Sequence, residues 1–257
     1  MQATDLELLT FAARKSGDIA KGFFGRDPEV WHKPDDAGPV TAADLAVNTM
    51  LQDTLRAARS GYGWLSEETE DGADRLNADT LFVVDPIDGT RAFINGSKDW
   101  AHSIAIAHKG QVTAAAVYLP MRDLMFTASL GGGAFLNGQA IKSTATSNLA
   151  DATLLTHKAN CQAKYWREGV FPETKIAFRS SLAYRLCLVA QGRFDAMFTL
   201  RPTWEWDVAA GTLIVSEAGG VATDQAGGAV KFNNPHPQLN GLVAAGNLHA
   251  TLLAQLA

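Results

Sequence analysis

Cysteine is scarce in this chain, which has two among its 257 residues, Cys161 and Cys187. Neither belongs to a C-x-x-C pair, so the sequence offers no zinc or thiol redox motif. Cys187 lies in an apolar stretch of helical character, where we expect it to be part of the core. This cysteine usage is typical of a reducing compartment, and we expect a cytoplasmic location.

Basic residues are also fewer than acidic ones. Lys and Arg number 22 against 27 Asp and Glu, which gives a net charge of −5. A general nucleic-acid-binding protein needs a basic face, so this balance argues against that class. A local basic pocket is still allowed.

Long apolar runs are missing as well. Residues 124–141 and 232–257 lack Asp, Glu, Lys and Arg, but Gly, Asn and Gln interrupt both stretches. Neither predicts a membrane span. The initial segment MQATD has neither the basic nor the apolar region of a signal peptide. Apolar residues make up 47% of the chain, so it can bury a full core in one large domain or two closely joined ones.

The order of the apolar patterns predicts an N-terminal α+β half, residues 1–147, and a smaller α/β half, residues 148–257. Thr4 and Thr41 are candidate N-caps of two helices, and residues 25–38 are expected to form a mobile loop. Mainly antiparallel strands are expected at 63–66, 81–84, 102–107, 112–118, 125–129 and 134–136. The second half should contain helices at 181–191 and 207–218 and a strand at 194–198.

The segment Asp85-Pro86-Ile87-Asp88-Gly89-Thr90 is the most informative motif. It follows an apolar run that reads as a buried strand, so two carboxylates lie close together where the strand ends. Closely placed carboxylates repel one another unless a cation lies between them, and hard oxygen ligands suit Mg²⁺ or Mn²⁺. Backbone amides at Gly89 and Thr90 are suited to hold a phosphate. The alternative is a surface turn, in which Asp and Gly serve turn geometry alone.

Other acidic residues add to this motif. Glu67-Glu68 follows a predicted strand, and Asp44 and Asp207 lie near predicted helix starts. Each has a purely structural alternative, because Asp near a helix N-terminus stabilises the helix dipole and acidic runs often lie in solvated loops. Asp207 lies between tryptophans and small residues, where a charge needs a partner, and a metal would serve.

Together these residues resemble the inositol monophosphatase family of Mg²⁺-dependent, Li⁺-sensitive phosphatases. The matching segments are Glu67-Glu68, residues 85–90 and Trp206-Asp207-Val208-Ala209-Ala210-Gly211, and the resemblance covers nearly the whole chain. It implies an α/β layered fold, an αβαβα sandwich of the inositol monophosphatase and fructose-1,6-bisphosphatase type. It also implies a phosphomonoesterase that uses two or three Mg²⁺ ions, with Mn²⁺ as an alternative.

The resemblance further implies a role for each matching residue. The metal ligands would be Glu67, Asp85, the Ile87 carbonyl, Asp88 and Asp207. The catalytic residues would be Asp44 and Thr90, which orient the attacking water, and Glu67, which can hold a third ion. The substrate contacts would be Asp88, Gly89, Thr90, Ser181, Arg185 and Asp207.

The substrate is expected to be a small phosphorylated metabolite. Many inositol-specific members carry an acidic residue at the position that Leu200 occupies here. Residues 202–207, Pro-Thr-Trp-Glu-Trp-Asp, instead resemble the P-T-x-E-W-D pattern of bacterial 3′(2′),5′-bisphosphate nucleotidases. Arg91-Ala92 departs from the Lys-Glu of that branch. Ser180-Ser181-Leu182 is similar to its G-S-S-L segment, but the leading Gly is absent. The leading hypothesis is hydrolysis of 3′-phosphoadenosine 5′-phosphate to AMP, with inositol-1-monophosphatase and then histidinol phosphatase as alternatives.

Basic and aromatic residues near these motifs fit the nucleotidase hypothesis. Arg179, Arg185 or Arg201 would pair with a second phosphate, and Trp204 would stack on a base. The structural alternative is that the arginines form surface ion pairs and that Trp204 is part of the core. A homodimer is also compatible with the resemblance. A non-catalytic regulatory binding protein is the alternative from another class.

Overall fold

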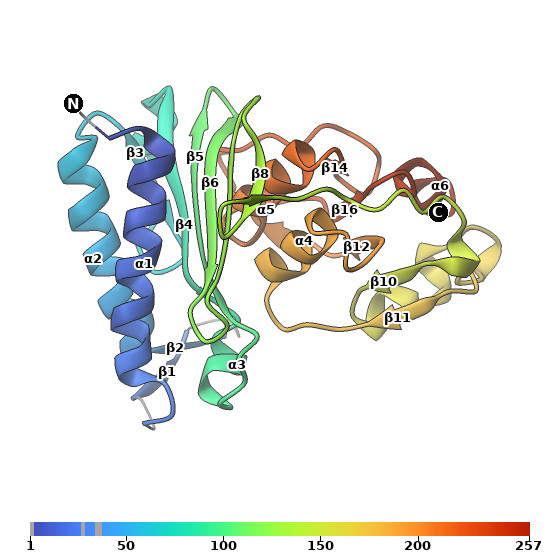
Figure 1. Cartoon of the computed structure of the whole chain (residues 1–257), viewed down its shortest axis with the longest axis horizontal. Coiled ribbons are helices and arrows are strands. Elements are labelled where there is room, and N and C mark those ends of the chain that lie inside the picture. The colour runs from blue at the N-terminus through green and yellow to red at the C-terminus, as the bar shows by residue number, and fades with distance from the viewer. Residues whose placement is uncertain (1–2, 27–28, 34–37) are drawn as a thin grey trace.

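The computed structural model of the chain describes residues 3–26, 29–33 and 38–257. Its elements form five layers in the order helix, sheet, helix, sheet, helix (Figure 1). The expected αβαβα sandwich is therefore confirmed. The helices of the described chain are α1 (Asp5–Phe23), α2 (Ala42–Ala58), α3 (Thr90–Ile94), α4 (Leu182–Ala190), α5 (Glu205–Glu217) and α6 (His249–Leu253).

The larger sheet of the described chain has seven strands in sequential order. Its strands are β3 (Gly63–Ser66), β4 (Thr80–Asp88), β5 (Ala101–His108), β6 (Gln111–Leu119), β7 (Leu124–Ser129), β8 (Gly133–Leu136) and β9 (Gln139–Ala140). All neighbours pair antiparallel except β3 and β4, which run parallel. The antiparallel prediction is right except for this pair, whose shared direction brings the carboxyl ends of both strands to one edge.

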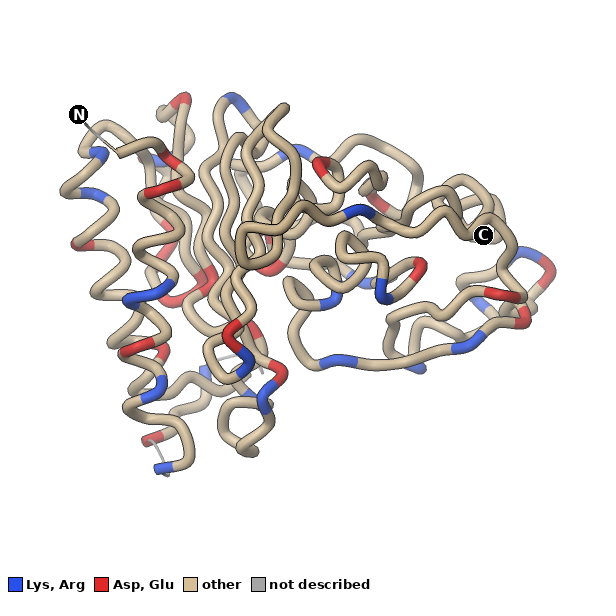
Figure 2. The backbone as a smooth tube through the Cα atoms, viewed as in Figure 1, with Lys and Arg blue, Asp and Glu red and all other residues tan. Residues whose placement is uncertain are grey.

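The smaller sheet lies in the C-terminal half and has the strand order β11-β10-β12-β16-β14. Its strands are β10 (Thr153–Leu155), β11 (Lys175–Ala177), β12 (Ala196–Thr199), β14 (Val221–Thr223) and β16 (Leu242–Ala245). Two short pairs complete the strands, β1 (Val30–His32) with β2 (Pro39–Thr41) and β13 (Thr203–Trp204) with β15 (Gln238–Leu239). Charged residues of both signs lie mainly on α1, α2 and the loops, whereas most strands carry none (Figure 2).

Alternating side chains explain why the sheets are covered on both faces. In β4, Phe82 and Val84 pack in the core under α1 and α2, whereas Leu81 and Val83 belong to the core shared with α4 and α5. Successive strand residues point to opposite faces, so an uninterrupted apolar strand must be covered on both sides. The smaller sheet repeats this arrangement, because Met197 of β12 faces α4 and α5 while Phe198 faces the α6 side. The central core therefore draws residues from both halves of the chain.

Helix starts agree with the capping residues. Thr4 and Thr41 each form a capping box, in which the threonine hydroxyl accepts a backbone N–H and an acidic side chain three residues later accepts from the cap backbone. Helix α5 begins at Glu205, two residues before the predicted start, and Trp204 is its N-cap. The sequence does not mark this start, because the Trp204 side chain makes no capping hydrogen bond.

Part of the predicted loop at residues 25–38 forms a β-strand. Val30–His32 forms β1 and pairs antiparallel with β2, so this part of the prediction is wrong. Residues 27–28 and 34–37 lie outside the described residues. No helix in the described ranges combines the length and apolar character that a membrane crossing requires.

Candidate active site

A cavity of about 450 Å³ lies where the carboxyl ends of β3 and β4 meet the N-terminal parts of α4 and α5. Three of the central layers thus contribute to its wall. The residues that line it are Gly38, Pro39, Glu67, Asp85, Ile87, Asp88, Gly89, Thr90, Arg91, Ala92, His157, Asn160, Phe178, Ser180, Arg185, Thr199, Arg201 and Asp207.

Three carboxylates meet at the floor of this cavity. Glu67, Asp85 and Asp207 each place an oxygen within 4.8 Å of the others, and we call these residues the acid cluster. Asp85 is buried, and its Oδ1 has no hydrogen-bond partner among the described residues. Burial, followed by the charges of Glu67, Asp88 and Asp207, raises the pKa of Asp85 well above its usual value. The cluster is thus a site of concentrated negative potential.

Strand pairing explains how residues so far apart in sequence meet. In the parallel β3–β4 pair, Ser66 stands beside Val84, and the Glu67 amide donates to the Val84 carbonyl at 3.1 Å. Glu67, directly after β3, and Asp85, within β4, therefore lie at the same level of two neighbouring strands. Helix α5 packs against this sheet and brings Asp207 to them from the C-terminal half.

The Asp85–Thr90 segment is an irregular strand end rather than a strand followed by a simple turn. Strand β4 continues to Asp88, with a register shift between Asp85 and Asp88. Proline has no amide to donate, so Pro86 interrupts the ladder here. Gly89 follows with φ of 99°, and an added Cβ would lie 3.2 Å from the Asp99 carbonyl oxygen. Glycine is thus required for the sharp entry into α3.

Asp88 is held from the other half of the molecule. Its Oδ2 accepts the Ser181 hydroxyl at 2.6 Å and the Ala183 amide at 2.6 Å. Burial is the main reason that the pKa of Asp88 is raised to about 6, and these hydrogen bonds oppose the increase. Ser181 is fully buried and does not line the cavity. The Ser181 hydroxyl holds Asp88 and caps α4, so Ser181 acts on the cavity through Asp88.

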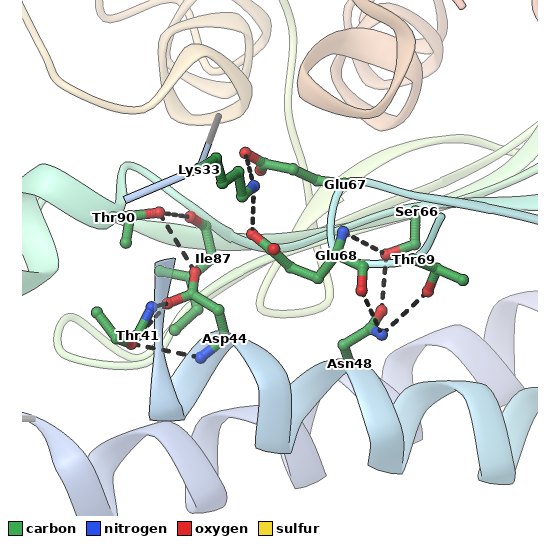
Figure 3. A network of polar contacts seen from close by, with 10 residues as sticks. All are labelled: Lys33, Thr41, Asp44, Asn48, Ser66, Glu67, Glu68, Thr69, Ile87 and Thr90. Carbon is green, nitrogen blue, oxygen red and sulfur yellow. Dashed lines mark hydrogen bonds and ion pairs between the residues drawn. The ribbon is translucent and has the colours of Figure 1, made fainter. Parts of the chain in front are cut away.

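Asp44 and Thr90 lie together as the resemblance implied. The Thr90 hydroxyl is 3.3 Å from Asp44 Oδ1 and 3.1 Å from the Ile87 carbonyl oxygen, while Thr41 holds Asp44 Oδ2 (Figure 3). Burial raises the pKa of Asp44 to about 6. Asp44 thus serves both as part of a capping box and as the neighbour of Thr90. The structural and functional interpretations of this residue are compatible.

Lys33 is a charged neighbour that the motifs did not reveal. Its ammonium donates to Glu67 at 2.9 Å and to Glu68 at 2.7 Å (Figure 3). Burial alone would lower the pKa of Lys33, but the two carboxylates outweigh it and raise the pKa. Lys33 lies in a segment with no motif of its own, so only the tertiary contact identifies it.

The outer wall of the cavity is basic and aromatic. Arg91, Arg185 and Arg201 line it, together with the rings of His157 and Phe178. Arg179 does not line it and forms an ion pair with Asp99 at 3.7 Å instead. Sequence reasoning named Arg185 and Arg201 but missed Asn160, His157 and Phe178, which come from loops without a recognisable spacing.

Trp204 does not lie at the cavity. Its ring stacks on Trp206, with centroids 4.7 Å apart and an interplanar angle of 9°, and it is not among the lining residues. The expectation that Trp204 stacks on a base is therefore wrong. The structural alternative, a core tryptophan, holds, because Trp204 packs against the central core.

The acid cluster fits divalent cations. Carboxylate oxygens are the ligands that Mg²⁺ and Mn²⁺ prefer, and Asp85, whose Oδ1 has no partner among the described residues, lines the same cavity. Like charges placed this closely gain most from a multivalent counter-ion. Glu67, Asp85 and Asp207 are the residues that the structure brings together for this purpose. Asp88 and the Ile87 carbonyl line the same cavity but are not part of the cluster.

Comparison with known proteins agrees with this chemistry. The family model described as the inositol monophosphatase family matches residues 2–257. An inositol-1-monophosphatase of Rhizobium meliloti is 36% identical over 82% of this chain and 79% of its own length. The Nus factor SuhB of Escherichia coli is 36% identical over 94% of this chain and 91% of its own length. Among solved structures, an IMPase of Thermotoga maritima has a TM-score of 0.82 at 27% identity, covering 96% of this chain and 94% of that one.

Proposed function

The chain belongs to the inositol monophosphatase family and is a phosphoric monoester hydrolase, and we propose that it prefers a nucleoside 3′,5′-bisphosphate, with 3′-phosphoadenosine 5′-phosphate as the leading substrate. Enzymes of this family act on small phosphate esters and generally use divalent metal ions. The observation that carries the substrate proposal is the pair Arg185 and Arg201 on the outer wall of the cavity.

The carboxylates at the floor of the cavity would support hydrolysis by holding divalent ions. Bound divalent ions would activate a water molecule and stabilise the leaving oxygen. Glu67, Asp85 and Asp207 would hold them, with Asp88 and the Ile87 carbonyl as further oxygen donors at the same cavity. The Thr90 hydroxyl would form a hydrogen bond with the attacking water. Asp44 accepts a hydrogen bond from this hydroxyl and would orient it. The cavity wall at Gly89 and Thr90 would hold the phosphate that is transferred.

A second phosphate has a place beside the two arginines. Burial, together with the positive charge of Arg201, lowers the pKa of Arg185 to about 10, and the charges of Asp88 and Asp207 oppose this decrease. The two guanidinium groups are therefore close enough to repel one another. A phosphate carries up to two negative charges and would relieve this repulsion by pairing with both groups. Inositol-1-phosphate has no second phosphate to do so.

The position of Leu200 supports the same preference. Leu200 packs in the core beside α6 and does not line the cavity. Among the described lining residues, the carboxylates are Asp88 and the acid cluster on the floor. The outer wall thus lacks a carboxylate, within the described part of the chain, that would accept hydrogen bonds from a polyol. Unpaired hydroxyls in that place would cost about 1–3 kcal/mol each.

Inositol-1-phosphate is the second candidate substrate. The observation in its favour is the Rhizobium meliloti relative, whose name describes an inositol-1-monophosphatase at 36% identity. Arg91-Ala92, where nucleotidases carry Lys-Glu, points the same way. The similarity to the Escherichia coli Nus factor SuhB supports a regulatory role as an additional property.

The test is a phosphate-release panel with Mg²⁺ in one buffer. The panel contains 3′-phosphoadenosine 5′-phosphate, inositol-1-phosphate, histidinol phosphate and fructose-1,6-bisphosphate. We expect the highest kcat/KM for the bisphosphate nucleotide, inhibition by Li⁺ and loss of turnover in excess EDTA. A higher kcat/KM for inositol-1-phosphate would overturn the substrate proposal, and full turnover in EDTA would overturn the metal dependence.

A further inference from the structure

Phe178 is an exposed aromatic ring at a polar cavity. It lines the cavity next to Ser180 and is 47% exposed, although large apolar side chains are usually buried. It follows the edge strand β11 and precedes α4, and it is not part of the acid cluster. The hydrolysis chemistry described above makes no use of it. An exposed ring at a binding cavity suggests contact with an apolar part of the ligand.

The Arg185 side chain holds the Phe178 ring in place. The Arg185 guanidinium carbon lies 4.5 Å from the ring centroid of Phe178, a cation–π contact. The Nε of Arg185 donates to the Arg179 carbonyl, which fixes the guanidinium under the ring. The surface is therefore preorganised, and little conformational entropy would be lost when a ligand binds to it.

His157 forms the second ring of this part of the wall. Its ring centroid lies 5.7 Å from that of Phe178 at an interplanar angle of 76°, and both residues line the cavity. The Ala159 amide donates to His157 Nδ1 at 3.1 Å, so the neutral ring carries its proton on Nε2. An aromatic surface and a hydrogen-bond donor thus lie side by side. Sugars and polyols have no planar ring that needs such a surface.

We propose that Phe178, with His157 beside it, binds the planar purine base of the leaving nucleotide by stacking. This inference rests on the proposed nucleotide substrate and assigns to Phe178 the role that the sequence suggested for Trp204. Geometry favours the new assignment, because Trp204 stacks on Trp206 away from the cavity whereas Phe178 is open to it. The neighbouring Arg185 and Arg201 would then receive the second phosphate of the same nucleotide.

Stacking predicts a specific kinetic change. Replacement of one stacking ring typically changes binding by about ten- to a hundredfold. In Phe178→Leu, an apolar side chain without a planar face, we expect KM for 3′-phosphoadenosine 5′-phosphate to rise about tenfold. The comparison substrate is 1-O-methylribose 3,5-bisphosphate, which lacks the base. The ratio of kcat/KM for the two substrates should fall about tenfold, and Phe178→Trp should restore it.

A direct binding measurement separates this inference from the proposed function. Calorimetric titration of AMP and of ribose 5-phosphate into wild type and Phe178→Leu reports on the base even if another ester is hydrolysed faster. We expect about tenfold weaker AMP binding in the variant and a smaller change for ribose 5-phosphate. Phe11→Leu, at an exposed ring on α1, is the matched control. Equal effects on both ligands, or unchanged AMP binding, would overturn the stacking role.

Discussion

The Ser181 hydroxyl donates to Asp88 Oδ2 at 2.6 Å and joins the two halves of the chain at the cavity. Both residues are buried, and Ser181 also caps α4 through the Tyr184 amide. The contact spans 93 positions in the sequence. It fixes the orientation of a carboxylate beside the acid cluster from the helix that carries Arg185.

Replacement of Ser181 should therefore impair the site through Asp88. In Ser181→Ala, Asp88 keeps the Ala183 amide but loses the hydroxyl, so we expect kcat to fall about tenfold and stability to fall by about 1 kcal/mol from the lost cap. Ser181→Thr keeps the hydroxyl and serves as the control. Steady-state kinetics and thermal unfolding measure the two effects. Wild-type activity in Ser181→Ala would show that the Ala183 amide alone positions Asp88.

Asp207→Asn and Asp88→Asn should both abolish turnover but differ in their effect on the metal-free fold. Asp207 faces other carboxylates, so removal of its charge relieves repulsion, and the melting temperature in EDTA should rise by a few degrees. Asp88 is also disfavoured as a buried anion, but the Ser181 hydroxyl and the Ala183 amide oppose this, so the melting temperature of its variant should rise less. Thermal unfolding in EDTA distinguishes them. Retained turnover in either variant would exclude that carboxylate from the metal chemistry.

Thr90→Ala should lower kcat much more than it changes KM. The hydroxyl lies between Asp44 and the Ile87 carbonyl, where it can orient a water molecule but adds little to ground-state binding. Loss of a general-base contact typically reduces the rate by about 10²–10⁴-fold. Thr90→Ser keeps the hydroxyl and should retain most activity. If KM alone changed, Thr90 would be a binding residue.

Arg201→Gln should weaken use of the nucleotide bisphosphate selectively. The variant loses one charge of the pair that we assign to the second phosphate, so kcat/KM for the bisphosphate should fall about ten- to a hundredfold. The change for inositol-1-phosphate should be within about threefold. Arg179→Gln is the matched control, because Arg179 does not line the cavity. Equal losses on both esters would argue against a dedicated site for the second phosphate.

Stability of the metal-free protein should decrease as pH rises from about 4 to about 7. Burial is the main cause that raises the pKa of Asp88 to about 6 and that of Glu68 to about 7, from 3.8 and 4.5. A pKa that is raised on folding stabilises the native state below the unfolded pKa, and this contribution is lost as pH rises through the folded value. His102 acts in the opposite direction, because burial lowers its pKa from 6.5 to about 4, so its contribution is lost as pH falls.

Denaturant unfolding in EDTA at several pH values measures this dependence. Glu68→Gln removes one of the groups with a raised pKa, so its stability should decrease less steeply toward neutral pH than that of wild type. Addition of Mg²⁺ should reverse the trend, because metal binding favours the ionised carboxylates. Identical pH profiles for the variant and wild type would show that folding does not raise the pKa of Glu68.

Local sequence was sufficient to predict two short-range features beside the cavity. Asp85 and Asp88 lie close to one another on a strand whose apolar alternation is visible in the sequence, and Thr41 and Asp44 form a capping box within one turn. Such features depend on neighbours within a few positions, so pattern and spacing carry them. The match of three motifs to one family then predicted the αβαβα layers, which the structure confirms.

Only the tertiary structure decided which residues form the rest of the cavity. Lys33 reaches Glu67 and Glu68 across more than thirty positions, and the Ser181 hydroxyl holds Asp88 from the other half of the chain. Phe178 faces the cavity while Trp204 stacks on its neighbour, although both are aromatic residues near a motif. These outcomes depend on how helices and sheets pack against one another. Packing brings together loops that are far apart in the sequence. The spacing of residues within a short segment therefore cannot predict which side chains come into contact.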